Sequence, residues 1–261
     1  LYKISEVVIL KRVLVLSDMH CGGASGMLPR DYYNADRDLH LQQSHVQEML
    51  FEQWENMVHS VGAVDAVICN GDIVDGLNRK GKGKDIQVTD MMVQCDIARQ
   101  LLSMIDCHRF IFTQGSNYHI GDNPSCDEMI CTMMKGEWFG HFGDVMFDNI
   151  TMNVQHWKSY SKNNHGGFDS MMGDIDQLRL QGDEADIYIR SHIHNFKYSG
   201  GSNYLAVATP CWKGMDGFTS EKSQKRPDNG YILFNIEGSD YSWDYNIFKI
   251  PKYFFVKHRN Y

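Results

Sequence analysis

Val13-Leu14-Val15-Leu16-Ser17-Asp18-Met19-His20 joins a short apolar run to two side chains that are common metal ligands. An apolar run of this length, rich in β-branched residues, predicts a strand buried on both faces, as in a parallel sheet. Asp18 and His20 should therefore lie in the loop at the carboxyl end of this strand. In open α/β sheets, ligands bind at that edge.

The same order, an apolar run followed by polar residues, recurs twice in the first half of the chain. Residues 66–69 precede Asn70-Gly71-Asp72-Ile73-Val74-Asp75, and residues 110–112 precede Gly115-Ser116-Asn117-Tyr118-His119. Amphipathic helices are predicted between the strands, one from Ser44 with a capping box to Gln47, and one from Thr89 that should bury Met92. Strands that alternate with helices run parallel with right-handed crossovers, so these polar groups should meet at one edge of a sheet.

The second half of the chain has shorter alternating runs, which predict a second sheet. A hairpin should turn at Asp148-Asn149 and end near Gln155-His156. A helix is expected over residues 171–180, and a strand at 187–189 leads to Ser191-His192-Ile193-His194. Further strands are predicted at 204–207, 231–234 and 241–248. The fold class is α/β, with two sheets packed face to face and helices outside.

Composition sets limits on the functional class. The chain has 261 residues, of which 43% are hydrophobic, so we expect a single domain over residues 1–261. A net charge of -8 argues against a broad basic face for duplex nucleic acid. The seven cysteines have no paired CxxC spacing, which favours free thiols in a reducing compartment. The sequence has no apolar run that would span a membrane, and we expect a cytoplasmic protein without a membrane partner.

The spacing of the polar residues predicts metal binding. Asp18 and His20 lie two positions apart, as do His192 and His194, so each pair can reach one ion. A site with two cations needs a bridging carboxylate between them, and Asp72 is the best candidate for it. Carboxylate and imidazole ligands accept Mn, Fe, Zn or Ni. The sequence therefore predicts two divalent ions, with Mn²⁺ expected first and Fe, Zn, Ni or Mg as alternatives.

In this order, Asp18-x-His20, Gly71-Asp72-x-x-Asp75, the asparagine turn, a single histidine and His192-x-His194 resemble the motifs of the calcineurin-like metallophosphoesterases. The resemblance spans residues 18 to 194. It implies a four-layer α/β/β/α sandwich with two central mixed sheets, and a dinuclear centre that hydrolyses phosphate esters. By this resemblance, one metal is held by Asp18, His20, Asp72 and His194, and the other by Asp72, Asn117, His156 and His192.

The sequence departs from the family pattern at the third and fifth motifs. The family has Gly-Asn-His followed by an acid, whereas here one residue is inserted on each side of Asn117. The turn is also similar to the GTxxHxG turn of phage- and prophage-type members. The resemblance then makes His119 the catalytic acid that protonates the leaving oxygen, with Asp75 as the second catalytic residue, orienting a ligand or a backbone amide. Ser191 replaces a glycine before His192.

Several alternatives remain open from the sequence. His165 competes with His156 as the single-histidine ligand. The basic run 79–84 would grip phosphate or face solvent, and Trp157, Tyr160 and Trp212 would stack on a substrate or pack in the core. The expected substrate is a phosphomonoester or phosphodiester, with nucleotides or nucleic acid suggested by the phage-type resemblance. The alternative functions are a manganese-dependent DNA exo- or endonuclease and a non-catalytic protein-binding scaffold, and a homodimer is compatible with each.

Overall fold

The computed structural model describes residues 9–77, 85–119, 125–156, 166–215 and 226–250. Its first sheet has six strands in the order β13-β12-β1-β4-β5-β6. Strands β1, β4, β5 and β6 are parallel, and β12 and β13 continue the sheet in antiparallel pairing. The strand bounds are β1 (Lys11–Leu16), β4 (Ala66–Asn70), β5 (Phe110–Thr113), β6 (Glu137–Trp138), β12 (Asn229–Glu237) and β13 (Asp240–Phe248).

The second sheet has five strands in the order β10-β11-β9-β8-β7. Strands β8, β9 and β11 are parallel, whereas β7 and β10 pair antiparallel at the two edges. The strand bounds are β7 (Phe142–Phe147), β8 (Ile150–Gln155), β9 (Ile187–Arg190), β10 (Lys197–Gly200) and β11 (Leu205–Ala208). Both sheets are thus mixed, with a parallel centre.

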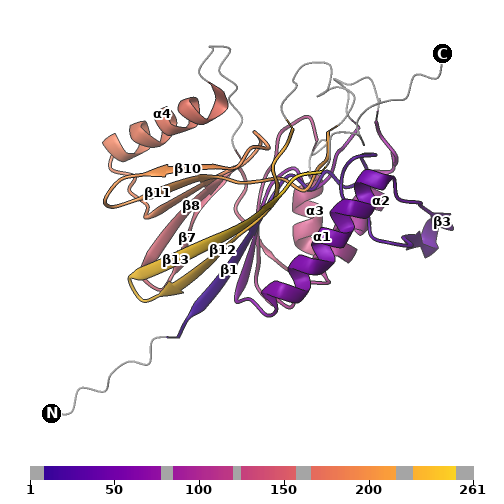
Figure 1. The fold of residues 1–261 in the computed structure, drawn as a ribbon, viewed down its shortest axis with the longest axis horizontal. Helices are drawn as coiled ribbons and strands as arrows, with labels where there is room; N and C mark the ends of the chain where they lie inside the picture. The colour runs from indigo at the N-terminus through magenta and orange to yellow at the C-terminus, as the bar shows by residue number, and fades with distance from the viewer. Residues whose placement is uncertain (1–8, 78–84, 120–124, 157–165, 216–225, 251–261) are drawn as a thin grey trace.

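Four α-helices cover the outer faces of the sheets in the described part of the chain. They are α1 (His45–Val61), α2 (Met91–Leu102), α3 (Cys126–Met133) and α4 (Gly166–Leu180). Helices α1 to α3 lie on one side of the two sheets and α4 lies on the other (Figure 1). A small hairpin, β2 (Tyr33–Asn34) and β3 (Leu39–His40), encloses the 3₁₀ helix η1 (Ala35–Arg37).

The core confirms this layering, because alternate residues of one strand face different layers. Leu14 and Leu16 of β1 pack in the cluster beneath α1 to α3, whereas Val13 and Val15 pack between the two sheets. A third cluster, around Ile175, joins α4 to the second sheet. The predicted four-layer α/β/β/α sandwich with two central mixed sheets is therefore confirmed.

Some features predicted for single helices and strands are confirmed, and others are not. The capping box at Ser44 and Gln47 is present, and β7 and β8 form the predicted hairpin around Asp148-Asn149. The prediction that Met92 is buried is wrong: its side chain lies on the solvent face of α2 and is 43% exposed. Helix α3 and the short strands β6 and β10 were not predicted.

Trp212 and most of the cysteines are buried in the core. Trp212 is buried and its ring packs edge-on against Trp54, 5.0 Å between centroids. All seven cysteines are free, and Cys126 and Cys131 are buried on α3. No helix in the described residues is long and apolar enough to cross a membrane.

Candidate metal centre

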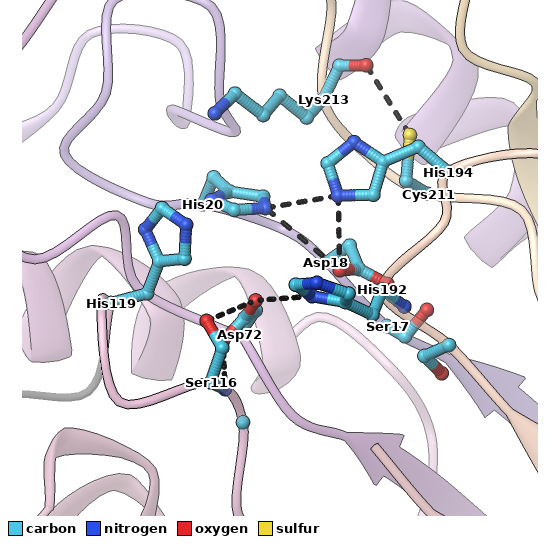
Figure 2. A network of polar contacts seen from close by, with 12 residues as sticks. Ser17, Asp18, His20, Asp72, Ser116, His119, His192, His194, Cys211 and Lys213 are labelled. Carbon is cyan, nitrogen blue, oxygen red and sulfur yellow. Dashed lines mark hydrogen bonds and ion pairs between the residues drawn. The ribbon is translucent and has the colours of Figure 1, made fainter. Parts of the chain in front are cut away.

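The predicted ligands lie in loops that follow parallel strands of both sheets. Asp18 and His20 come after β1, Asp72 after β4, His156 directly after β8, and His192 and His194 after β9. Figure 2 shows the side chains of Asp18, His20, Asp72, His192 and His194 converging on a common space. The fold thus brings together residues that are up to 176 positions apart in the chain.

The first group consists of Asp18, His20 and His194, whose ligand atoms all lie within 4.8 Å of one another. His194 Nε2 is 3.1 Å from Asp18 Oδ1 and 3.3 Å from His20 Nε2. His20 Nε2 is 3.9 Å from the same carboxylate oxygen. Two residues of this group belong to the first sheet and one to the second.

The second group consists of Asp72, His156 and His192. His156 Nε2 is 3.0 Å from Asp72 Oδ2 and 3.3 Å from His192 Nδ1. His192 Nδ1 is 3.7 Å from Asp72 Oδ2. Of the two histidines that compete for the single-histidine position, His156 lies beside Asp72, and His165 lies outside the described residues.

Outer contacts determine which ring nitrogens face these groups. His156 Nδ1 is 2.8 Å from the carbonyl oxygen of Asn70, and His20 Nδ1 is 2.9 Å from Asp75 Oδ1. A carbonyl or carboxylate oxygen only accepts, so Nδ1 carries a proton in both rings, and Nε2 is the nitrogen that faces the group. In a neutral His156 the lone pair of Nε2 would oppose Asp72 Oδ2 at 3.0 Å, so either a proton on Nε2 or a metal ion must lie between the two atoms.

The pKa values express the same need for positive charge. Burial alone would lower the pKa of His156, but the charges of Asp72 and Asp18 raise it to about 10. Burial alone would raise the pKa of Asp72, and the neighbouring histidines, His156 first, hold it well below its ordinary value. Without a metal, a proton on His156 meets this need. A divalent cation would meet it more fully.

The spacing of the ligand atoms fits an ion. Two ligands at about 2.1 Å from one ion, in tetrahedral to octahedral directions, are about 3.0–3.4 Å apart. Four of the separations above lie at 3.0–3.3 Å and the other two at 3.7 and 3.9 Å. One carboxylate and two imidazoles in each group suit Mn²⁺, Fe²⁺ or Zn²⁺.

The backbone is also specialised at the ligands. Asp18, His20, Asp72, His192 and His194 all have positive φ, between 48° and 75°. Such values are uncommon outside glycine and cost free energy, so they persist where the surrounding structure fixes them. Gly71 and Gly115 permit the close turns: a Cβ on Gly115 would lie 2.2 Å from Asp72 Oδ1.

A third group of potential ligands consists of His20, Asp75 and His119. The ammonium group of Lys213 already lies beside this group. Lys213, which follows β11, places Nζ 3.2 Å from Asp75 Oδ1, and both side chains are buried. Burial would raise the pKa of Asp75, but the hydrogen bond from His20 and the charge of Lys213 hold it below its ordinary value. Asp75 thus lies behind His20 and orients its ring.

His119 lies on the open side of the site. Its Nδ1 is 2.7 Å from the carbonyl oxygen of Asp75, so Nδ1 donates, and its ring packs edge-on against His20 with 4.5 Å between centroids. The side chains of His119, His192 and His194 are 18%, 23% and 26% exposed, whereas those of Asp18, His20, Asp72 and His156 are at most 1% exposed. A substrate would therefore approach from the side of His119, His192 and His194.

Asn117 is the predicted ligand that the structure does not bring into these groups. It is exposed in the turn after β5, whereas the preceding Ser116 is buried. Ser116 donates its backbone N–H to Asp72 Oδ1 at 2.6 Å, and its hydroxyl lies 3.0 Å from Oδ2. The signal for Ser116 was in the sequence, because Ser116 is the hydroxyl residue of the GTxxHxG-like turn.

Two other residues in contact with the site, Lys213 and Asp127, were not predicted, because neither belongs to a recognisable sequence motif. Asp127 is fully buried on α3, and burial, followed by the charge of Asp72, raises its pKa to about 7. The basic run 79–84, Trp157 and Tyr160 lie outside the described residues, so the roles predicted for them stay predictions.

Several solved structures are similar to this chain. An archaeal phosphodiesterase is similar to the chain with a TM-score of 0.50 at 12% identity, over 90% of this chain and 99% of that one. This is the metallophosphoesterase fold. A predicted phosphoesterase of Streptococcus pneumoniae has a TM-score of 0.45 at 13% identity, over 92% of this chain and 91% of its own. Vps29 of Entamoeba histolytica, complexed with zinc, has a TM-score of 0.45 at 13% identity, over 91% of this chain and 98% of that one.

No protein-family model and no curated protein matches the sequence. At these identities the similarity shows the fold alone. The resemblance to the phage-type branch stays a prediction.

Proposed function

We propose that the protein is a metal-dependent phosphoesterase that hydrolyses phosphomonoesters or phosphodiesters. The observation that carries the proposal is the pair of ligand groups at one end of the sandwich, each with one carboxylate and two imidazoles whose ligand atoms lie within 4.8 Å of one another. Asp18, His20 and His194 would hold one ion, and Asp72, His156 and His192 the other. Mn²⁺ as the metal belongs to this proposal, in which Asp72 is a ligand of the second ion.

Bound divalent ions would polarise the phosphoryl group and activate water for in-line attack. The protein residues then need to orient the ester and protonate the leaving oxygen. His119 is suited to the proton transfer, because the carbonyl oxygen of Asp75 accepts from Nδ1 and leaves Nε2 for the substrate. Asp75 Oδ1, 3.6 Å from His119 Nδ1, would stabilise the protonated ring.

The test is hydrolysis of bis(p-nitrophenyl) phosphate with Mn²⁺, together with metal analysis of the purified protein. We expect close to two equivalents of metal, and at least about 100-fold lower kcat/KM in Asp72→Asn, since even outer residues of metal sites contribute 10–100-fold. His119→Ala should lower kcat while both metals stay bound. Asp36→Asn, an exposed residue of η1, is the matched control and should change neither measurement.

The alternatives have distinct outcomes in the same assays. Hydrolysis of p-nitrophenyl phosphate against the diester separates monoesterase from diesterase activity, and degradation of single-stranded DNA with Mn²⁺ would support the nuclease. No hydrolysis of any ester at saturating Mn²⁺ would contradict the proposal. No bound metal after purification without chelator would favour the scaffold.

A further inference from the structure

Asp127 is a buried carboxylate whose described hydrogen bonds serve neither its own helix nor a cation. The N-cap of α3 is Ser125, which accepts from the backbone N–H of Glu128. Asp127 is 0% exposed, and its oxygens accept from backbone N–H groups that lie 54 and 12 positions away in the chain. A buried carboxyl group with such partners needs a reason outside helix α3.

The two bonds tie together two turns of the metal centre. Asp127 Oδ1 accepts from Ile73 N at 3.2 Å, and Oδ2 accepts from Gly115 N at 2.8 Å. Ile73 directly follows Asp72, and Gly115 directly precedes Ser116. One carboxylate therefore connects the turn that carries Asp72 to the turn that contacts it.

Both turns determine where the Asp72 carboxylate points. Ser116 donates its backbone N–H to Asp72 Oδ1 at 2.6 Å, and its hydroxyl lies within 3.1 Å of both oxygens. The turns also interlock sterically, because a Cβ on Gly71 would lie 2.6 Å from the Cα of Gly115. A shift of either turn would thus move Asp72 relative to His156 and His192.

We propose that Asp127 is a positioning residue that sets Asp72 for the second ion by clamping the Asp72 and Ser116 turns. This inference rests on the proposed function, in which Asp72 is a metal ligand. Asp127 itself touches neither the ligand side chains nor the substrate space in any described contact. It acts through the backbone of Ile73 and Gly115.

Asp127→Asn is the sharpest variant. An asparagine has one acceptor oxygen, so its amide nitrogen would face one of the two N–H groups and a bond would be lost. In calorimetric titration of the full chain with Mn²⁺, we expect one ion to bind roughly 10–100-fold more weakly. The other ion should keep its affinity, because no described bond of Asp127 reaches the loops of Asp18, His20 or His194. Hydrolysis by the variant should recover toward wild type at saturating Mn²⁺.

Glu128→Gln is the matched control, since it makes the same change from carboxyl to amide at the next residue of α3, and its titration should equal that of wild type. A wild type that binds two ions and an Asp127→Asn variant with the same two affinities would overturn the inference alone. Equal weakening of both ions would overturn it too, because that result indicates general damage. A wild type that binds no metal overturns the proposed function as well.

A measurement on the wild type keeps the inference testable if the variant does not fold. Amide hydrogen exchange of the metal-free protein, followed by NMR, reports the Ile73 and Gly115 N–H groups directly. We expect both to exchange slowly, as buried and bonded amides do. Exchange at the rate of exposed amides would show that the clamp is absent, and would overturn the inference.

Discussion

Lys213 pairs with a carboxylate deep in the site, and the pair has little access to water. Its Nζ lies 3.2 Å from Asp75 Oδ1, and the two side chains are 8% and 2% exposed. Removing one partner of a buried ion pair leaves the other charge uncompensated. Lys213→Met should therefore lower the free energy of unfolding by about 3–5 kcal/mol, measured by urea denaturation of the metal-free protein.

A double variant separates this pairing from simple loss of packing. Asp75→Asn combined with Lys213→Met removes both charges, so its loss should be smaller than the sum of the single losses. Lys11→Met is the matched control, because the Lys11–Asp65 pair is 34% and 40% exposed and such pairs contribute less than about 1 kcal/mol. Strict additivity of the two single variants would contradict the predicted coupling.

For single residues, the spacing along the chain predicted those site contacts that form between near neighbours in sequence. His20 lies in the group of Asp18, as their spacing predicted, whereas His192 and His194 have the same spacing and lie in different groups. Ser116, Asp127 and Lys213 depend on contacts with residues 44, 54 and 138 positions away. No local pattern carries those contacts, so only the folded arrangement shows them.

At the scale of elements, a chain of buried polar side chains connects the carboxyl ends of strands from both sheets. Ser191, after β9, accepts from Asn70 Nδ2 at 2.6 Å and from Thr209 Oγ1 at 2.8 Å. Thr209 continues to Ser17 at 2.7 Å, and Asn70 continues to Thr113 at 2.6 Å. Ser191 thus joins β4 of the first sheet to β9 and β11 of the second.

Ser191→Ala should lower the free energy of unfolding by about 1–3 kcal/mol, because it leaves buried donors on Asn70 and Thr209 short of an acceptor. The measurement is urea denaturation with the metals removed. Ser199→Ala on the edge strand β10 is the control, since no hydrogen bond of its hydroxyl is described, and it should stay close to wild type. Equal stabilities of the two variants would show that the Ser191 hydroxyl contributes nothing.

The sequence predicted the long helices and the apolar strands better than the short helices and strands. Helix α1 has both a capping box and a long apolar face, and β1 and β4 each contain a continuous apolar run of four residues, so local signals agree with the fold. Helix α3 has only eight residues, and β6 has two. Elements this short depend on tertiary packing more than on their own pattern.

At the scale of the whole molecule, the two ligand groups join the two sheets. Asp18 and His20 of the first sheet face His194 of the second, and Asp72 of the first faces His156 and His192 of the second. An ion in either group would therefore cross-link the layers of the sandwich. It would also neutralise carboxylates that are almost fully buried.

Metal removal should accordingly destabilise the entire fold and not only the loops. Binding at a hundredfold excess over Kd contributes about 2.7 kcal/mol per ion, which corresponds to roughly 5–10 °C in Tm for a chain of this size. Calorimetric scans with Mn²⁺ and with EDTA measure the shift. In Asp72→Asn the shift should shrink toward that of a single ion, whereas Asp36→Asn should keep the full shift. Because the ligands of each ion come from both sheets, unfolding with metal should remain one cooperative transition. If EDTA changed only a separate transition of the loops and left the main unfolding transition where it was, the cross-link would be contradicted.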